Sequence, residues 1–340
     1  MDAGPPESTG CPKHMVHGPC GGVRADLSCE VDRRPCPFAR LTDPVAWAGT
    51  TPAPTASGSR LLRAIEDGPV VVTDLTVPPF DAAAVASITE VLRGSTDALL
   101  VGEHQDQPDF SPTLMARLVS DSGGRPWVTL TCRDRNRVVL EQELASLGPS
   151  GADGVLCVTG DARVDGGLPG VTQVFDLDGT RLTALAASYG LAAAVAESPG
   201  APPRPLRPRR LLQKQRAGAR LAILNHLGSA EDVEVFVRAA RAAGVTIPII
   251  AAVPVYSDAR SAQVLADLPG LHLDDRRAAR VVEAAEPERA GVETAVEQAR
   301  RLLSIDGVAG VNLSGMASSR GELHAAMLKA EIGEQIRRLG

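Results

Sequence analysis

The segment GVLCVTGD, residues 154–161, is a short apolar run of strand length that ends in a Gly-Asp pair. The chain holds eight runs of this kind, separated by amphipathic segments. They are PVVVTDLT (69–76), DALLVGE (97–103), PWVTLTC (126–132), GVLCVTGD (154–161), GLAAAVAESP (190–199), LAILNH (221–226), IPIIAAVP (247–254) and GVAGVNLSG (307–315). Strands this apolar are buried on both faces, as in a parallel sheet that helices cover.

The segments between these runs carry apolar residues three and four positions apart, which is typical of amphipathic helices. Clear examples are residues 232–244, 291–304 and 321–339. Eight strand–helix units over residues 59–340 fit a (βα)8 TIM barrel, whose usual size is roughly 250 residues. The sequence therefore predicts an α/β fold with a TIM barrel over 59–340, and an open doubly wound sheet is the alternative.

Composition limits the partners of the chain. With 340 residues, of which 44% are hydrophobic, it can bury a full core without covalent cross-links. Its net charge of −6 argues against a surface that binds nucleic acid or anionic lipid. No apolar stretch reaches the roughly 20 residues of a membrane span, and the N-terminus lacks the apolar region of a secretory signal. We expect a cytoplasmic protein with neither a membrane nor a nucleic-acid partner.

Four of the six cysteines lie near the N-terminus, beginning in CPKHMVHGPCGG (11–22). In a reducing compartment, clustered cysteines more often bind metal or do redox chemistry than form disulfides. We predict that residues 1–40 form a cysteine-rich module that holds zinc or a 4Fe–4S cluster, followed by a linker at 41–58. The predicted ligands are Cys11, Cys20, Cys29 and Cys36.

The type of metal site stays open. The Cys36-Pro37 pair slightly favours an iron–sulfur cluster. The spacing lacks CxxC pairs, so unpaired thiols in an irregular tail are the alternative. Cys132 and Cys157 lie within apolar runs and are expected to be small core residues.

Polar residues follow the predicted strands, where TIM barrels place their chemistry. They are Asp74, Glu103, His104, the run TCRDRNR (131–137), Asp161, Glu197, Asn225, His226 and Tyr256. The basic run RPLRPRR (204–210) is typical of a flexible surface loop. The histidines show no HxxxH pair, and no GxGxxG follows a strand, which argues against a histidine metal site and a Rossmann nucleotide site.

Six segments together resemble the methylenetetrahydrofolate reductase family and follow that family's order. They are TDLTVPPFD (73–81), TLTCRDRNR (129–137), GVLCVTGD (154–161), KQRAGARLAILN (214–225), IPIIAAVPVYS (247–257) and GVAGVNLSG (307–315). The cysteine-rich segment resembles a module found with some members or in their partner subunits. The resemblance implies a barrel flavoenzyme that passes a hydride from NAD(P)H through FAD to methylenetetrahydrofolate.

The resemblance also assigns catalytic and substrate-binding residues. Asp74 stands where the family has a Glu that protonates the folate nitrogen, and a carboxylic acid can do this. Asp161 matches an Asp that lies near the flavin and acts electrostatically. Asn225, in place of a family Gln, and Tyr256 are the implied substrate-binding residues.

The implied FAD-binding residues are Thr129, Thr131, Arg133, Thr159, Gly160 and Lys214. Lys214 matches a Lys that meets the cofactor's phosphate or ribose, where its charge is favourable. The arginines of 133–137 could neutralise pyrophosphate or the folate glutamate tail, or they are solvated residues at a helix start. Thr129 and Thr159 replace family residues that contact the cofactor.

Two functions of different class follow from these residues. The first is a methylenetetrahydrofolate reductase-like oxidoreductase acting on CH–NH groups, with folate as its small-molecule substrate. A variant of it takes the hydride directly from nicotinamide. The second is a divergent folate-binding or electron-transfer subunit with a metal-carrying module and no catalysis of its own. Association as a homo-oligomer, or with a redox or methyltransferase subunit, is compatible with either.

Overall fold

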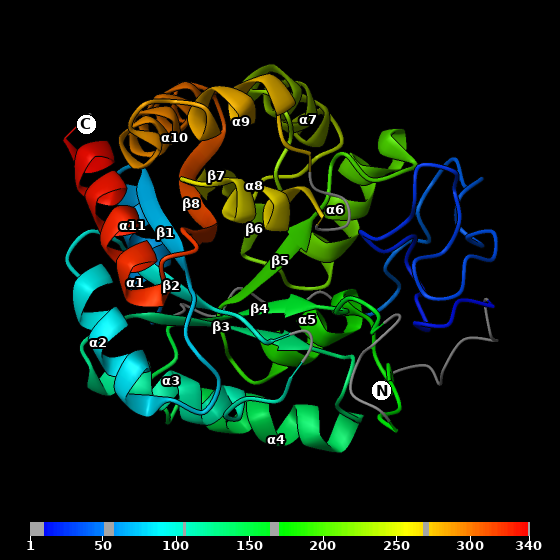
Figure 1. Cartoon of the computed structure of the whole chain (residues 1–340). Coiled ribbons are helices and arrows are strands. Elements are labelled where there is room, and N and C mark those ends of the chain that lie inside the picture. Colours follow the sequence, from blue (N-terminus) through cyan, green and yellow to red (C-terminus); the bar gives the residue numbers. More distant parts are fainter. Residues whose placement is uncertain (1–9, 51–57, 105–106, 164–169, 268–271, 339–340) are drawn as a thin grey trace.

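The computed structural model describes residues 10–50, 58–104, 107–163, 170–267 and 272–338. In these residues, eight parallel strands pair in chain order and close into a barrel, with β1 hydrogen-bonded to both β2 and β8 (Figure 1). The strands are β1 (Val70–Leu75), β2 (Ala98–Val101), β3 (Pro126–Thr131), β4 (Gly154–Val158), β5 (Ala193–Glu197), β6 (Leu221–Leu224), β7 (Ile249–Tyr256) and β8 (Val308–Ala317). The predicted TIM barrel is confirmed, and the open sheet is excluded.

Helices surround the barrel (Figure 1). They are α1 (Arg60–Asp67), α2 (Ala82–Leu92), α3 (Pro112–Asp121), α4 (Arg137–Leu147), α5 (Gly179–Ser188), the 3₁₀ helix η1 (Arg204–Leu206), α6 (Arg207–Arg216), α7 (Ala230–Ala242), α8 (Ala259–Ala266), α9 (Asp275–Val282), α10 (Pro287–Leu303) and α11 (Glu322–Arg337). Most begin at a side chain that accepts a hydrogen bond from the first turn, such as Ser111 before α3 and Asn136 before α4.

Side chains along each strand point alternately toward the barrel interior and toward the surrounding helices. Val70 and Val72 of β1 belong to an apolar cluster that also contains Leu100, Leu156 and Ile223. Side chains two positions apart point to the same face of a strand, so residues two further along continue the inward-facing column. At the carboxyl ends of the strands, this column therefore changes from apolar to polar.

The opposite end of the barrel is closed by α1. Leu61 and Leu62 pack into the same interior cluster, and both are at most 9% exposed. Asp153, just before β4, accepts hydrogen bonds from the backbone N–H groups of Arg60 and Leu61 and from Trp127 Nε1. A sealed lower end leaves the carboxyl ends of the strands as the open mouth.

Residues 10–50 contain no helix or strand and lie beside the α5 and α6 side of the barrel (Figure 1). Met15, Val23 and Phe38 are nevertheless at most 4% exposed. Arg209 donates to the Thr42 carbonyl at 2.6 Å, and the Trp47 N–H donates to Gln213 Oε1 at 2.9 Å. The predicted module and the described part of the predicted linker therefore pack on α6, and the boundary at 58 stays a prediction.

The expectation of a surface loop at 204–210 is wrong. These residues form η1 and the start of α6, and both Arg207 and Arg210 are at most 4% exposed. Pro208 sits in the first turn of α6, where a missing N–H costs nothing. Among the described residues, we find no helix that is both long and apolar enough to cross a membrane.

Candidate active site

Two adjoining cavities occupy the open mouth of the barrel. The Lys13 cavity, about 350 Å³, contains Lys13, Cys20, Thr159, Glu197 and Lys214 in its wall. The His226 cavity, about 330 Å³, is lined by residues that include Asp74, His226 and Asn312. Both cavities share Gly21, Gly102, Thr129, Leu156, Asp161, Ala196, Ser198 and Asn225. They form one continuous site at the carboxyl ends of the strands.

Asp74 lies on the inward face of β1, two positions after Val72. Its Oδ1 accepts a hydrogen bond from Asn312 Nδ2 at 2.9 Å, and its Oδ2 accepts one from the Gly315 N–H at 3.3 Å. Its backbone carbonyl accepts a hydrogen bond from the buried Lys329 at 2.8 Å. These contacts fix the Asp74 carboxylate at the wall of the His226 cavity.

Asp161 follows β4 and borders both cavities. The residue is exposed overall, but protein groups around its carboxylate remove part of that group's hydration. This desolvation raises the pKa of Asp161, while the charges of Lys13 and Arg133 oppose the rise and Glu30 adds to it. The structure thus places Asp74 and Asp161 on the wall of the same cavity, and their chemical roles stay predictions.

His226 is 1% exposed, and neither ring nitrogen has a hydrogen-bond partner among the described residues. Burial lowers its pKa to about 4, although the charge of Asp74 and the nearby Ala252 carbonyl oppose this. The imidazole is therefore neutral at pH 7. Asn312 Oδ1 is also buried without a partner in this cavity wall. Unpaired buried polar atoms of this kind are costly, and a bound ligand or water can satisfy them.

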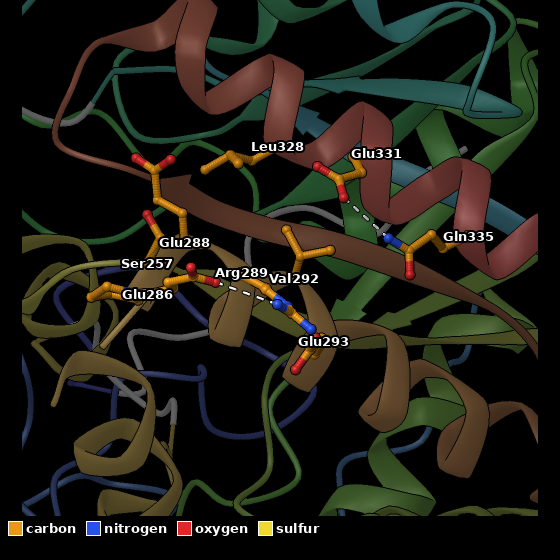
Figure 2. A pocket seen from close by; sticks show the side chains of 10 residues that line it. Ser257, Glu286, Glu288, Arg289, Val292, Glu293, Leu328, Glu331 and Gln335 are labelled. Carbon is orange, nitrogen blue, oxygen red and sulfur yellow. Dashed lines mark hydrogen bonds and ion pairs between the residues drawn. The ribbon is translucent and has the colours of Figure 1, made fainter. Parts of the chain in front are cut away.

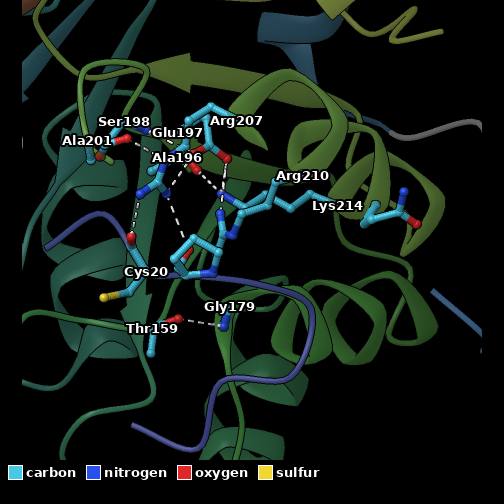
Figure 3. Close-up of polar contacts among 12 residues, drawn as sticks. Cys20, Thr159, Gly179, Ala196, Glu197, Ser198, Ala201, Arg207, Arg210 and Lys214 are labelled. Atoms are coloured by element: carbon cyan, nitrogen blue, oxygen red, sulfur yellow. Dashed lines mark hydrogen bonds and ion pairs between the residues drawn. The ribbon is translucent and has the colours of Figure 1, made fainter. Parts of the chain in front are cut away.

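Glu197 ends β5 and is the single carboxylate among three buried cations of α6 (Figure 3). Its oxygens lie 3.4 Å from Arg207, 3.0 Å from Arg210 and 2.8 Å from Lys214. Burial alone would raise the pKa of Glu197, but the three cations prevail and lower it to about 2. Burial lowers the pKa of Lys214 to about 8, with Arg210 acting in the same direction.

The residues expected to bind FAD all line the Lys13 cavity, but most of their polar groups already have partners. Thr131 donates to Glu103, Arg133 donates to Asp134, and Lys214 is paired with Glu197. The Thr159 hydroxyl contacts Met15 Sδ at 3.4 Å and accepts a hydrogen bond from the Gly179 N–H at 2.9 Å.

The Gly160 carbonyl accepts a hydrogen bond from Lys13 at 2.6 Å. The N-terminal segment therefore occupies part of the wall that the resemblance assigns to the cofactor.

The two predicted substrate-binding residues lie in different places. Asn225 borders both cavities and donates to Ser198 Oγ at 2.7 Å. Tyr256 is 3% exposed and packs with Leu265 and Val281, outside both cavities. The structure does not bring Tyr256 to this site.

Among the four N-terminal cysteines, Cys11, Cys29 and Cys36 lie close enough to act on one another electrostatically, whereas Cys20 faces Glu30. Cys20 Sγ donates to Glu30 at 3.1 Å beside the Lys13 cavity, and burial raises its pKa to about 12. Burial also raises the pKa of Cys11 and of Cys36, and nearby Cys29 adds to both. Nowhere in the described residues are three or more Cys, His, Asp or Glu side chains placed to hold a metal ion. The metal site is not confirmed and stays a prediction.

A larger groove of about 790 Å³ lies between α10 and α11 (Figure 2). Half of its lining residues are charged, and most of these side chains have polar partners. Arg289 lies between Glu286 and Glu293, and Gln335 donates to Glu331 at 3.2 Å. None of the residues predicted from the sequence borders it, and we place the site at the barrel mouth.

Sequence reasoning did not identify Lys13 or Asn312 as site residues. Asn312 lies two positions after Gly310 on the inward face of β8, so the alternation along its apolar run is the signal that could have found it. Lys13 comes from a segment far from the barrel in sequence, and its place depends on how that segment folds back. We see no local signal that predicts it.

A closed parallel barrel with a polar, carboxylate-bearing cavity at the carboxyl ends of its strands is the arrangement of (βα)8-barrel enzymes. Residues 100–329 match the family model described as methylenetetrahydrofolate reductase, and the chain belongs to this family. Residues 5–51 match a second model, described as methylene-tetrahydrofolate reductase C terminal. That segment includes all four N-terminal cysteines.

Solved structures share the fold at low sequence identity. An uncharacterized protein from Clostridium thermocellum that binds two copies of 5-methyl-5,6,7,8-tetrahydrofolic acid is 12% identical, with a TM-score of 0.58. The match covers 79% of this chain and 97% of that chain. Tryptophan synthase from M. tuberculosis is 14% identical with a TM-score of 0.47, and the match covers 83% of this chain and 98% of that chain. No curated protein matches the sequence.

Proposed function

We propose that the chain is a methylenetetrahydrofolate reductase-like oxidoreductase that reduces the one-carbon unit of a folate. The observation that carries this proposal is that Asp74 and Asp161 border one cavity at the barrel mouth of a member of this family. The Clostridium thermocellum protein, which shares the fold and binds a methylated tetrahydrofolate, supports a folate as the small-molecule ligand.

The chemistry needs one proton and one hydride. Asp74 gives a proton to the folate nitrogen as the five-membered ring opens, which leaves an iminium at the one-carbon unit. A hydride from the C4 position of NAD(P)H then adds to the methylene carbon, forming a methyl group and NAD(P)⁺. Atoms and charge balance, because the products are methyltetrahydrofolate and oxidised nicotinamide.

Asp161 acts on the cationic intermediate. An ionised carboxylate near the iminium favours its formation in a site that holds little water. Asn225 borders both cavities. Its proposed role is to hydrogen-bond the folate ring or the nicotinamide. We assign the role of proton donor to Asp74, as the resemblance implies, and the electrostatic role to Asp161.

FAD, which the resemblance implies, would supply a carrier for the hydride between nicotinamide and folate. In the described structure, however, Thr131, Arg133 and Lys214 hold partners of their own, and Met15 and Lys13 contact Thr159 and Gly160. These residues do not fit FAD in this arrangement, so the steps above include none. FAD binding stays a prediction, and direct transfer from nicotinamide is the variant that the contacts favour.

Zinc or an iron–sulfur cluster at the four cysteines would be structural or redox-active. The Cys20 thiol is directed to Glu30 rather than to another cysteine, so the described arrangement does not fit a four-thiolate site. No step of the proposed reaction uses this metal. Association with a second copy, or with a redox or methyltransferase subunit, also stays a prediction.

A second function is a folate-binding or electron-transfer subunit without catalysis of its own. The engaged polar groups at Thr131, Arg133 and Lys214 favour it, because a reductase that needs FAD would lack a site for it. An absorption spectrum and a nicotinamide oxidation assay separate the two.

Flavin bands would support the flavoenzyme. Folate-dependent NAD(P)H oxidation by a colourless protein would support direct transfer. A colourless protein that binds folate but oxidises neither nicotinamide would leave the binding subunit.

A further inference from the structure

The N-terminal segment reaches into the barrel mouth and contributes a charged residue to its wall. Lys13 is 2% exposed, and its ammonium donates to the Gly160 carbonyl at 2.6 Å, one residue before Asp161. It also pairs with the Glu30 carboxylate and lies 5.7 Å from the centre of the Phe175 ring. Both Lys13 and Asp161 border the Lys13 cavity.

Several contacts fix this segment on the barrel. The Val16 N–H donates to Asp178 Oδ2 at 3.0 Å, and His14 Nδ1 lies 2.8 Å from the Phe175 carbonyl oxygen. Arg207 donates to the Pro19 carbonyl at 3.3 Å and to the Cys20 carbonyl at 2.9 Å (Figure 3). Because these contacts span the loops after β4 and β5, Lys13 is held on one side of the mouth.

The two glycines after Cys20 allow the approach. A Cβ at Gly21 would lie 2.5 Å from Ser198 Oγ, and one at Gly22 would overlap the Glu30 carboxyl group. Any larger residue would push the segment away from β5 or displace Glu30 from Lys13. The GPCGG sequence (18–22) therefore has a packing role that does not depend on a metal.

The charged groups that act on Asp161 are Lys13, Glu30 and Arg133. Arg133 donates from Nε to Asp134 at 2.9 Å, and its contact with Asp161 is to the backbone carbonyl, at 3.4 Å. The Cys20 thiol is neutral, since burial raises its pKa to about 12. Lys13 is therefore the main cation available to the Asp161 carboxylate, and it shares its charge with Glu30.

We propose that Lys13, carried into the mouth by the N-terminal segment, is a positioning residue that holds Asp161 in its charged form. This role rests on the proposed function, in which Asp161 stabilises a cationic intermediate while Asp74 supplies the proton. In this proposal, the N-terminal segment contributes a residue to the active site and is not a separate module.

The test measures the titration of Asp161 in the full chain, using carbon-13 NMR of labelled aspartate carboxyls with Asp161→Asn to assign the signal. A directly paired opposite charge lowers a carboxyl pKa by roughly 1 to 3 units. Lys13 contacts the Gly160 carbonyl rather than the Asp161 carboxylate, and Glu30 partly cancels its charge, so we expect an effect at the lower end of this range. In Lys13→Met, we expect the Asp161 midpoint to rise by about one pH unit. Lys13→Arg, which keeps the charge, should stay close to wild type.

Glu30→Gln is the matched control, because it breaks the same ion pair from the other side. It removes the negative charge that opposes Lys13, so the Asp161 midpoint should fall. Loosening of the segment would move the midpoint the same way in both variants, whereas the charge effect moves it in opposite directions. Midpoints that do not change, or that shift in the same direction, overturn the proposal. If Lys13→Met does not fold, Lys13→Gln takes its place with the same expected rise, and a midpoint that falls or stays constant overturns the proposal.

Activity provides the second readout. The acid limb of the pH–kcat profile for folate reduction should move up by about one pH unit in Lys13→Met, and Lys13→Arg should restore it. Absence of folate reduction in the wild-type protein contradicts the proposed function but leaves the NMR titration to decide the role of Lys13. An unmoved NMR midpoint in an active enzyme contradicts only the role of Lys13.

Discussion

Replacing Glu197 with Gln should destabilise the barrel strongly at neutral pH. The three cations of α6 hold the pKa of this buried carboxyl at about 2, against an ordinary value of 4.5. A difference of about 2.5 units corresponds to about 3 kcal/mol of stabilisation. Because the folded-state pKa is depressed, this stabilisation is complete above about pH 5 and is lost as the pH falls through about 2. Breaking a buried ion pair from one side commonly costs about 3–5 kcal/mol.

The assay is urea unfolding at several pH values. Unfolding is monitored through tryptophan fluorescence, to which the fully buried Trp127 contributes. We expect Glu197→Gln to lose about 3–5 kcal/mol at pH 7, with the gap to wild type narrowing toward pH 2. Glu141→Gln is the control, since Glu141 forms an exposed pair with Arg137 four residues away and its loss should change stability little. A Glu197→Gln protein within about 1 kcal/mol of wild type at pH 7, or a gap that does not change with pH, would refute the reasoning.

Three further predictions follow from the site. Asp74→Asn should lower the rate of steady-state folate reduction by roughly 100- to 10,000-fold, whereas Asp74→Glu should keep activity. If Asp74→Asn turns over at the wild-type rate, Asp74 is not the proton donor. Gly21→Ala should lower the melting temperature because its Cβ would lie 2.5 Å from Ser198 Oγ. Adding Ser198→Ala should recover part of the loss relative to Ser198→Ala alone, which itself removes the acceptor of Asn225. Without recovery, that contact is not the cause. The ring signals of His226 in nitrogen-15 NMR should not titrate between pH 5 and pH 8, since burial lowers its pKa to about 4, and a midpoint near pH 6.5 would contradict the buried neutral imidazole.

The barrel could be predicted from the sequence because its strands are buried on both faces. Runs such as LAILNH (221–226) and IPIIAAVP (247–254) are apolar throughout, which a sheet with one solvated face would not permit. The period of two along each run then locates the inward-facing residues. Asp74 and Asn225 follow the apolar interior column in this way, and both line the His226 cavity.

Contacts between side chains that are far apart in the sequence could not be predicted. The run RPLRPRR looked like a surface loop because arginines are seldom buried without partners. Here Arg207 and Arg210 are buried because Glu197, which ends β5, is directly opposite them. Lys13 reaches the cavity through contacts with residues more than 140 positions away, such as Gly160. No local pattern in the sequence encodes such a pairing.

Tyr256 was predicted at the site from its position in the sequence, but the structure does not place it there. It follows the apolar run of β7, so its position suggested a place at the barrel mouth. In the structure it packs under α8 and α9 against Leu265 and Val281, and burial raises its pKa to about 12. A strand end alone does not decide whether a side chain faces the cavity or the surrounding helices.

The most direct test of the proposed function is the oxidation of NADH and of NADPH by the purified full chain, with and without methylenetetrahydrofolate. We predict oxidation that depends on the folate and yields one methyltetrahydrofolate per nicotinamide oxidised, with Asp74→Asn inactive in the same assay. A wild-type protein that binds the folate yet oxidises neither nicotinamide would contradict the account and leave the folate-binding subunit in its place.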